Sequence, residues 1–573
     1  MNKNQKIILI PAILISISLF LIPLYSQADI LNQRENFFVN PKFDRYKRTK
    51  LNATLRHISD NAYFYIEDSY WDSIGSVKTG SILNNILELA DDFDNIIYPK
   101  ETQFWGSEPK PGIDGDPGIT ILFHELTDNN GGYFDTSNGY ALKQVSNSNQ
   151  REMIVINSSV ASDRSEIIKN FLAHEFQHLI SFNQKDLKYG DPEDTWLNEL
   201  RSEYSLSVTG YNDTFSGSNL ERRLSTFTNN PSDSLTEWPN SIIDYGMAAL
   251  FGEYLVEQYG PGILRDTLKS SLFGISSLNQ YLQSHGYYER FSDIFMNWMG
   301  VVYLNDRSQN SKLGYSRSDL ASLRVRPHQN IYLSYNFQEY SIIQAIKDWQ
   351  PVWLEFDVST VSADQTKSLR IDFDGQPGEN YIASSLAFYE SGPVELGKIN
   401  IISGRGSGYA SNSGKRLKKV VVMVTKATET SGFKENEPTG YLNIKVSTVD
   451  NKIVQANSIK DGVLIKRPNE KEIYVIWGKY KRYLNPGVIS LYGHLNPANA
   501  IEVEPEIFNS YQTSNYVKYV NEQKVYAVWP DSTKHWMNIT PQQWDASSRD
   551  WGAIFTINDL EVNYYKTGLD IIR

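Results

Sequence analysis

Residues 171–180, which read Phe-Leu-Ala-His-Glu-Phe-Gln-His-Leu-Ile, constrain this chain more than any other stretch. Apolar residues recur through and around it at intervals of three and four, and Asp163 and Glu166 upstream have the spacing of a capping box, so a helix is predicted. His174 and His178 are four residues apart and therefore lie one turn apart on one helix face. Two imidazoles so placed can chelate a metal ion.

The residue next to the first histidine is Glu175. Its carboxylate projects close to the same point, where it can take a proton from a metal-activated water, which is the logic of the H-E-x-x-H motif of zinc peptidases. The chain contains no cysteine. Any metal must therefore be held by histidine, aspartate and glutamate.

The third metal ligand distinguishes classes of zinc site, because a catalytic zinc uses three protein ligands and an open position. The pattern H-E-x-x-H-x-x-G-x-x-H requires glycine at 181 and histidine at 184, where this chain has Ser181 and Gln184. That class is excluded. Instead, the sequence Asn-Glu-Leu-Arg-Ser-Glu follows at 198–203 on a second predicted helix, which brings Glu199 21 residues after His178.

H-E-x-x-H followed by N-E-x-x-S resembles the gluzincins, the thermolysin-like group of zinc metallopeptidases. The resemblance implies one zinc ion held by His174, His178 and Glu199, with Glu175 as the general base. It also implies an α+β zincin-like catalytic domain, with a mixed sheet and an active-site helix followed by a helical subdomain.

Two further residues receive supporting roles from this resemblance. Glu203 occupies the position where thermolysin-like enzymes carry an aspartate bonded to the free nitrogen of a ligand imidazole, and Asn198 begins the second motif. Glutamate at this position departs from the family pattern by one methylene. More specifically, the combination Ala-His-Glu-Phe-Gln-His, Trp-Leu-Asn-Glu and Tyr-Gly-x-x-x-Leu-Phe resembles hyicolysin-like bacterial metallopeptidases over about residues 51–306.

Two other positions are candidates for chemistry. Tyr245 precedes a Gly-Met-Ala-Ala helix, as a transition-state-stabilising tyrosine does in related aminopeptidases, so its phenol is a candidate donor to the oxyanion. The alternative is an aromatic anchor for the helix. Asp114-Gly-Asp116 is a candidate calcium site, although a turn before a strand explains the same residues without an ion.

The N-terminus and the charge indicate where such a protein works. A basic start, an apolar run over residues 7–25 and the small-x-small sequence Ser26-Gln-Ala28 predict an export signal over residues 1–28. The alternative is a retained membrane anchor, and no other stretch is apolar enough to span. We expect a secreted or cell-surface protein. Its net charge of −12 argues against nucleic acid as a partner.

At 573 residues the chain is predicted to be multidomain. After the signal, residues 29–50 are expected to be a linker or propeptide remnant and 51–316 the metallopeptidase domain. Residues 317–450 carry alternating Val, Ile and Tyr runs typical of a β-sandwich. The sequence Ile473-Tyr-Val-Ile-Trp recurs as Val525-Tyr-Ala-Val-Trp, which predicts two β-rich repeats of about 52 residues over 451–573.

The sequence therefore predicts an exported zinc-dependent peptidase acting on polypeptides. An endopeptidase is favoured because no Gly-x-Met-Glu-Asn-like motif for capturing an N-terminal amine precedes His174. Residues 152–157 are a candidate edge strand for pairing with an extended substrate. The alternative is an exported binding or adhesion protein with a non-catalytic core. In either case the β modules are candidates for binding the cell envelope or other protein surfaces.

Overall fold

The computed structural model describes residues 28–572 except 129, 162–164, 310–311, 335–336, 361–366, 403, 413–414, 451–458, 460, 494, 504, 521 and 548. The predicted export signal, apart from its last residue, and Asp163 of the predicted capping box lie outside the described residues. Among the helices that are described, none is both long and apolar enough to cross a membrane. The chain divides into one unit over 1–223 and 248–277 and another over 224–247 and 278–573.

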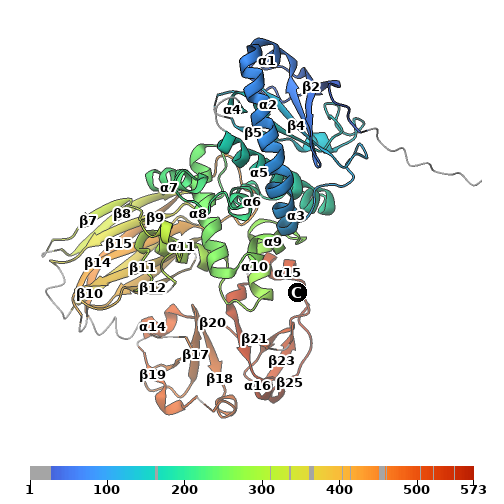
Figure 1. The fold of residues 1–573 in the computed structure, drawn as a ribbon. Helices are drawn as coiled ribbons and strands as arrows, with labels where there is room; N and C mark the ends of the chain where they lie inside the picture. The colour runs from blue at the N-terminus through green and yellow to red at the C-terminus, as the bar shows by residue number, and fades with distance from the viewer. Residues whose placement is uncertain are drawn as a thin grey trace, which may run out of the picture. The chain divides into compact units, whose positions relative to one another are not determined.

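The first unit contains a mixed six-stranded sheet in the order β1-β2-β3-β4-β6-β5 (Figure 1). Its strands are β1 (Arg34–Phe38), β2 (Lys50–Ile58), β3 (Ala62–Glu67), β4 (Ile119–His124), β5 (Gly132–Phe134) and β6 (Met153–Asn157). Strands β3, β4 and β6 run parallel, and the other three pair antiparallel. Every residue of the three parallel strands is buried, as expected for parallel strands covered on both faces.

Two expectations are corrected by this sheet. Residues 29–50 were expected to be a linker or propeptide remnant. They do not form a linker, because they contribute β1, which pairs with β2 along its length and buries Phe37. The strand expected at the edge is β6, but β6 lies between β4 and β5. Its continuous run of apolar residues fits an interior strand better, because a half-exposed edge would alternate. In the described part of the sheet, the short strand β5 forms the edge next to β6, and β1 forms the other edge.

Helices make up most of the rest of the first unit, and others belong wholly or partly to the second. They are α1 (Asp68–Ser73), α2 (Gly75–Asp92), α3 (Tyr98–Trp105), α4 (Ser158–Ala161), α5 (Ser165–Ser181), α6 (Thr195–Thr209), α7 (Asn219–Asn229), α8 (Ile242–Tyr259), α9 (Gly262–Leu268), α10 (Gly274–Ser284) and α11 (Phe291–Leu304). Helix α5 packs against β5 and β6 on one side and against α6 on the other. This places the predicted motif helix between the sheet and the second motif helix.

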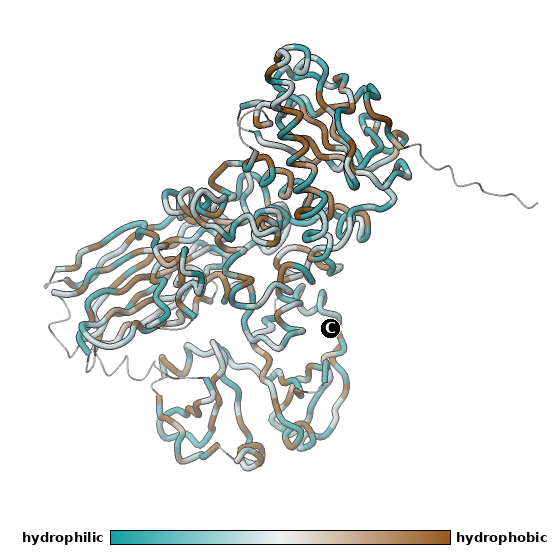
Figure 2. The backbone as a smooth tube through the Cα atoms, in the orientation of Figure 1, coloured by the Kyte–Doolittle hydropathy of each residue, from teal (hydrophilic) through white to brown (hydrophobic). Residues whose placement is uncertain are grey.

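The second unit contains two successive β regions. The first follows one path of nine strands, β7-β9-β14-β11-β12-β13-β10-β15-β8. These are β7 (Gln329–Tyr332), β8 (Glu339–Ile346), β9 (Val352–Asp357), β10 (Lys367–Gly375), β11 (Tyr381–Tyr389), β12 (Glu395–Ile402), β13 (Arg405–Ala410), β14 (Leu417–Lys426) and β15 (Gly440–Asp450). Residues from both ends of this path share one core, which is the arrangement of the predicted sandwich. Both hydrophobic (brown) and hydrophilic (teal) residues occur along these strands (Figure 2).

The C-terminal region consists of two five-stranded sheets of identical topology. One has the order β19-β16-β17-β18-β20 and the other β24-β21-β22-β23-β25. The strands are β16 (Leu464–Lys466), β17 (Ile473–Trp477), β18 (Tyr480–Leu484), β19 (Ile501–Glu502), β20 (Gln512–Thr513), β21 (Tyr516–Tyr519), β22 (Val525–Val528), β23 (Thr533–Trp536), β24 (Ile554–Ile557) and β25 (Lys566–Thr567). In each sheet the central pairs are antiparallel and the outer pairs parallel. Short helices connect successive strands within each sheet: α13 (Pro486–Ile489) and α14 (Pro505–Ser510) in the first, and α15 (Pro541–Ala546) and α16 (Asp559–Tyr564) in the second. The sequence repeat is thus a structural duplication.

Candidate metal centre

Three side chains from two helices converge in the first unit. His174 and His178 project from α5, and Glu199 projects from the first turns of α6. One possible ligand atom of each lies within 4.8 Å of the others. Glu199 Oε2 is 3.1 Å from His174 Nε2 and 3.4 Å from His178 Nε2. The predicted trio is therefore brought together, with both Nε2 atoms turned toward one carboxylate oxygen.

The opposite nitrogens of both imidazoles are held by α6. Glu203 Oε1 lies 3.4 Å from His174 Nδ1, and Ser202 Oγ lies 3.1 Å from His178 Nδ1. Ser202 also donates to Gln177 Oε1 at 2.6 Å, which ties α6 to the motif helix. When Nδ1 is engaged in this way, Nε2 is left oriented for a metal ion.

Glu203 is anchored by two residues that the sequence did not single out. Arg223 forms a two-pronged ion pair with it, at 2.6 and 2.8 Å, and Asn219 donates to it at 2.8 Å. Both come from α7, where no spacing links them to the motif. The longer side chain of Glu203 thus reaches His174 and is itself fixed. Asn198, the other predicted supporting residue, begins the motif on α6, and its Oδ1 is buried without a hydrogen-bond partner.

Glu175 is buried beside this trio and is 7% exposed. It lies on the side that faces the edge strand β5. Burial raises the pKa of its carboxyl above the ordinary value, while the neighbouring His174 and His178 act in the opposite direction. The backbone N–H of Phe134 in β5 hydrogen-bonds to it. A Cβ added to Gly132 in the same strand would lie 3.2 Å from Glu175 Cγ. The edge strand therefore borders the predicted base directly.

The charge pattern of the site fits a cation. Burial alone would raise the pKa of Glu199, but His178 and hydrogen bonds from both histidines lower it to about 2. Burial likewise opposes a charged His174, yet Glu199 and Glu203 raise its pKa to about 10. The carboxylates thus stabilise positive charge at the point where the ligand atoms meet. The donor set of two imidazoles and a carboxylate is one that zinc takes in hydrolytic sites.

The other predicted residues have hydrogen-bond partners of their own. Tyr245 belongs to the second unit, where it donates to Asn240 Oδ1 at 3.0 Å and packs edge-on against Trp238. Its role at the oxyanion stays a prediction. Asp116 accepts hydrogen bonds from Tyr63 Oη at 3.0 Å and from the Gly118 N–H at 2.8 Å. These contacts explain the turn at 114–116 without an ion.

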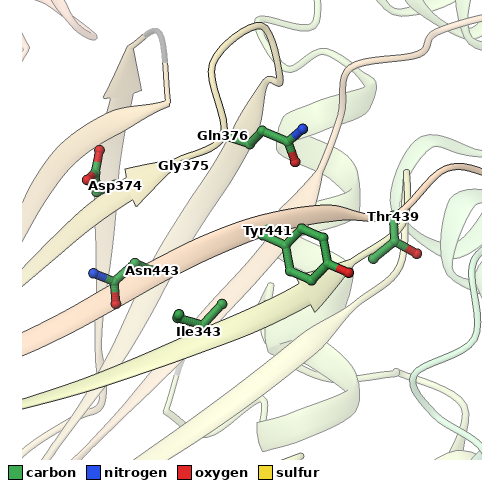
Figure 3. A pocket seen from close by; sticks show the side chains of 7 residues that line it. All are labelled: Ile343, Asp374, Gly375, Gln376, Thr439, Tyr441 and Asn443. Carbon is green, nitrogen blue, oxygen red and sulfur yellow. The ribbon is translucent and has the colours of Figure 1, made fainter.

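A shallow hollow is found on the β-sandwich of the second unit (Figure 3). Tyr441 and Asn443 of β15 and Ile343 of β8 form its floor, and Asp374 and Gln376 lie at its border. It shares no residue with the histidine and glutamate group.

Comparison with known proteins places these observations in context. No family model matches the chain. The residues described above define a candidate hydrolytic metal centre of the two-histidine, one-glutamate type. A neutral metalloprotease, ShpI of Staphylococcus hyicus, is 26% identical to the chain over 271 residues, which is 43% of this chain and 57% of that protein. The chain thus spans little more than half the length of that relative.

The chain is similar to PliG of Aeromonas hydrophila, a periplasmic inhibitor of g-type lysozyme, with a TM-score of 0.14 and 9% sequence identity. The match covers 21% of this chain and 99% of that chain. A TM-score this low carries no argument about fold or function.

Proposed function

We propose that this chain is an exported zinc-dependent peptidase of the gluzincin type, with endopeptidase activity. The observation that carries the proposal is the convergence of His174, His178 and Glu199 within 4.8 Å, with Glu175 buried alongside. The similarity to a neutral metalloprotease supports the same class from the sequence side.

His174, His178 and Glu199 would hold the zinc ion. When bound, zinc polarises a carbonyl and makes a water molecule acidic near neutral pH. Glu175 accepts the proton of the attacking water as the peptide bond is cleaved, and then returns it to the leaving amine. Its raised pKa suits both steps, since a carboxylate of ordinary pKa is a weak acceptor near pH 7.

Supporting residues fix this arrangement. Glu203 orients His174 by accepting a hydrogen bond from its Nδ1–H group, while Arg223 keeps the Glu203 carboxylate charged. Ser202 holds His178 at the other nitrogen. Imidazoles so constrained need little reorganisation to bind a metal, which raises affinity.

The edge strand suggests how a polypeptide is bound. In the described part of the sheet, β5 pairs with β6 on one side only, which leaves its other side available to an extended chain. A substrate paired there would run past Glu175, because Phe134 of β5 bonds to that carboxylate. Main-chain pairing does not depend on free substrate termini, which favours cleavage within a chain.

The test is proteolysis by residues 29–573 loaded with zinc, compared with Glu175→Gln. An unfolded protein and short peptides blocked at both ends serve as substrates. Cleavage of both by the wild type, with loss of roughly 10²–10⁴-fold in the variant, supports the proposal. Equal cleavage by both forms, or none by the wild type, refutes it.

A further inference from the structure

Three acidic side chains meet in the second unit, at one end of the β-sandwich. Asp348 precedes β9, while Glu429 and Glu437 belong to residues 427–439, which connect β14 to β15. One carboxylate oxygen of each lies within 4.8 Å of the others. Asp348 is 0% exposed and Glu437 is 4% exposed, and Glu429 is half-buried. Charges this deeply buried require partners.

Their hydrogen bonds leave two oxygens unused. Asp348 Oδ1 accepts from the N–H groups of Thr428 and Glu429, at 2.6 and 3.0 Å. Glu437 accepts from the N–H of Lys434 through Oε1. In contrast, Glu429 Oε2 and Glu437 Oε2 are buried atoms without a hydrogen-bond partner.

The nearby lysines pair with Asp348, Glu379 and Glu237. Lys426 Nζ lies 2.7 Å from Asp348 Oδ2 and 3.3 Å from Glu379. Lys347 pairs at 2.5 Å with Glu237. Among the described residues, no lysine or arginine lies within ion-pair distance of the Glu429 or Glu437 carboxylate.

The backbone is organised around the same point. Asp348 forms a parallel bridge to Lys426, and the Trp349 N–H donates to the Lys426 carbonyl at 2.8 Å. Trp349 is buried and has a φ of 51°, a conformation that costs free energy for a large side chain. Its indole donates to the Glu429 carbonyl oxygen at 2.9 Å.

We propose that Asp348, Glu429 and Glu437 bind a divalent cation of the calcium class. All three donors are carboxylates, which hard cations prefer, whereas zinc favours nitrogen and sulfur ligands. Lys426 is shared between Asp348 and Glu379, so the cluster keeps a net negative charge that favours a divalent ion. Calcium tolerates irregular geometry and accepts peptide carbonyls and water as further ligands, while magnesium demands a regular octahedron. The ion would fasten the 427–439 connection to the segment before β9.

This cation site shares no residue with the proposed zinc centre, so either can fail alone. Trp349 provides a local reporter, because its indole contacts the Glu429 backbone and can sensitise terbium luminescence. The full chain is kept saturated with zinc and freed of calcium by dialysis. Terbium is then titrated under tryptophan excitation and displaced with calcium.

We expect a sensitised signal that calcium displaces. Glu429→Gln and Glu437→Gln should each weaken binding by at least about tenfold, because a neutral amide replaces a charged ligand. Glu435→Gln is the matched control, since Glu435 is an exposed residue of the same connection. Calcium should also raise the thermal midpoint of the wild type and the control, but not of the two test variants.

Three results would overturn the proposal. They are the absence of a calcium-displaceable signal in the wild type, equal binding by wild type and both test variants, and equal weakening by Glu435→Gln. A thermal midpoint of the wild type that does not respond to calcium would also overturn it.

Discussion

Glu203 Oε1 lies 3.4 Å from His174 Nδ1 and accepts a hydrogen bond from Arg223, while Asn219 donates to Oε2 of the same carboxylate. A glutamate thus does here what the resemblance assigns to an aspartate. The extra methylene is accommodated because Arg223 fixes the carboxylate from the far side. The imidazole, its carboxylate and the guanidinium form one buried chain of contacts that ends at the proposed metal.

Replacing Glu203 should weaken zinc binding. Glu203→Gln removes the negative charge that orients His174 and leaves Arg223 buried without its partner, so zinc affinity should fall by roughly 10–100-fold. The zinc affinity is measured by competition with a chelator of known affinity. Glu166→Gln, on the exposed side of α5, should leave affinity unchanged. Equal affinity in Glu203→Gln and wild type would remove Glu203 from the site.

The edge strand should be sensitive to a single methyl group. In Gly132→Ala the new Cβ would lie 2.8 Å from the Val155 carbonyl oxygen and 3.2 Å from Glu175 Cγ. We expect kcat/KM to fall by about tenfold or more while zinc content stays at wild-type level, because β5 and Glu175 must shift. Gly80→Ala is the control, since no atom lies within 4 Å of its added Cβ. A kcat/KM of Gly132→Ala equal to that of the wild type would show that β5 does not affect catalysis.

Much of this site could be predicted from the sequence because helix periodicity fixes directions. His174 and His178 had to share a face, and Glu199 could be placed only through a resemblance, which the convergence at 3.1 and 3.4 Å now supports. Arg223, Asn219 and the edge strand could not be predicted. They reach the site through tertiary contacts between elements with no common sequence period.

The fold, like the site, could be predicted only in part. The repeat at 473–477 and 525–529 predicted two similar modules, and the two sheets have the same strand order. The position of residues 152–157 in the sheet was mistaken, because an apolar run of five residues fits an edge or an interior strand equally well until its neighbours are known. Similarly, β1 lies in a polar stretch that gives no strand signal.

Glu152 should make stability depend on pH. It is 4% exposed, and burial, with the nearby Asp114, raises its pKa to about 7 from 4.5. Between about pH 4.5 and 7, the folded state therefore keeps a proton that the unfolded state has lost. The contribution of this carboxyl group to stability is fully present below about pH 4.5 and is lost as the pH rises through about 7. The shift corresponds to about 3 kcal/mol.

Glu152→Gln removes that titration while an amide oxygen can still accept from the Ile113 N–H. Relative to wild type, the variant should gain stability in urea unfolding at pH 8 and gain little or nothing at pH 4.5. A difference between variant and wild type that is the same at both pH values would contradict the assignment.

A buried ion pair should hold the two C-terminal repeats together. Arg482 and Glu561 come from different repeats and are 4% and 0% exposed. Arg482 Nη1 lies 2.5 Å from Glu561 Oε1. Arg482→Met should destabilise this region by about 3–5 kcal/mol, because it leaves a buried carboxylate without its cation. Adding Glu561→Leu should restore most of that loss. Thermal unfolding of the two variants and the wild type measures the coupling, and additive losses would argue against it.

Zinc content and cleavage measured together test the central claim most directly. The samples are residues 29–573 as wild type, Glu175→Gln and Glu199→Gln, each dialysed against the same zinc buffer. We predict about one zinc per chain in the wild type and in Glu175→Gln, much weaker zinc binding in Glu199→Gln, and cleavage by the wild type alone. Wild-type zinc affinity in Glu199→Gln, or undiminished cleavage by Glu175→Gln, would contradict the account.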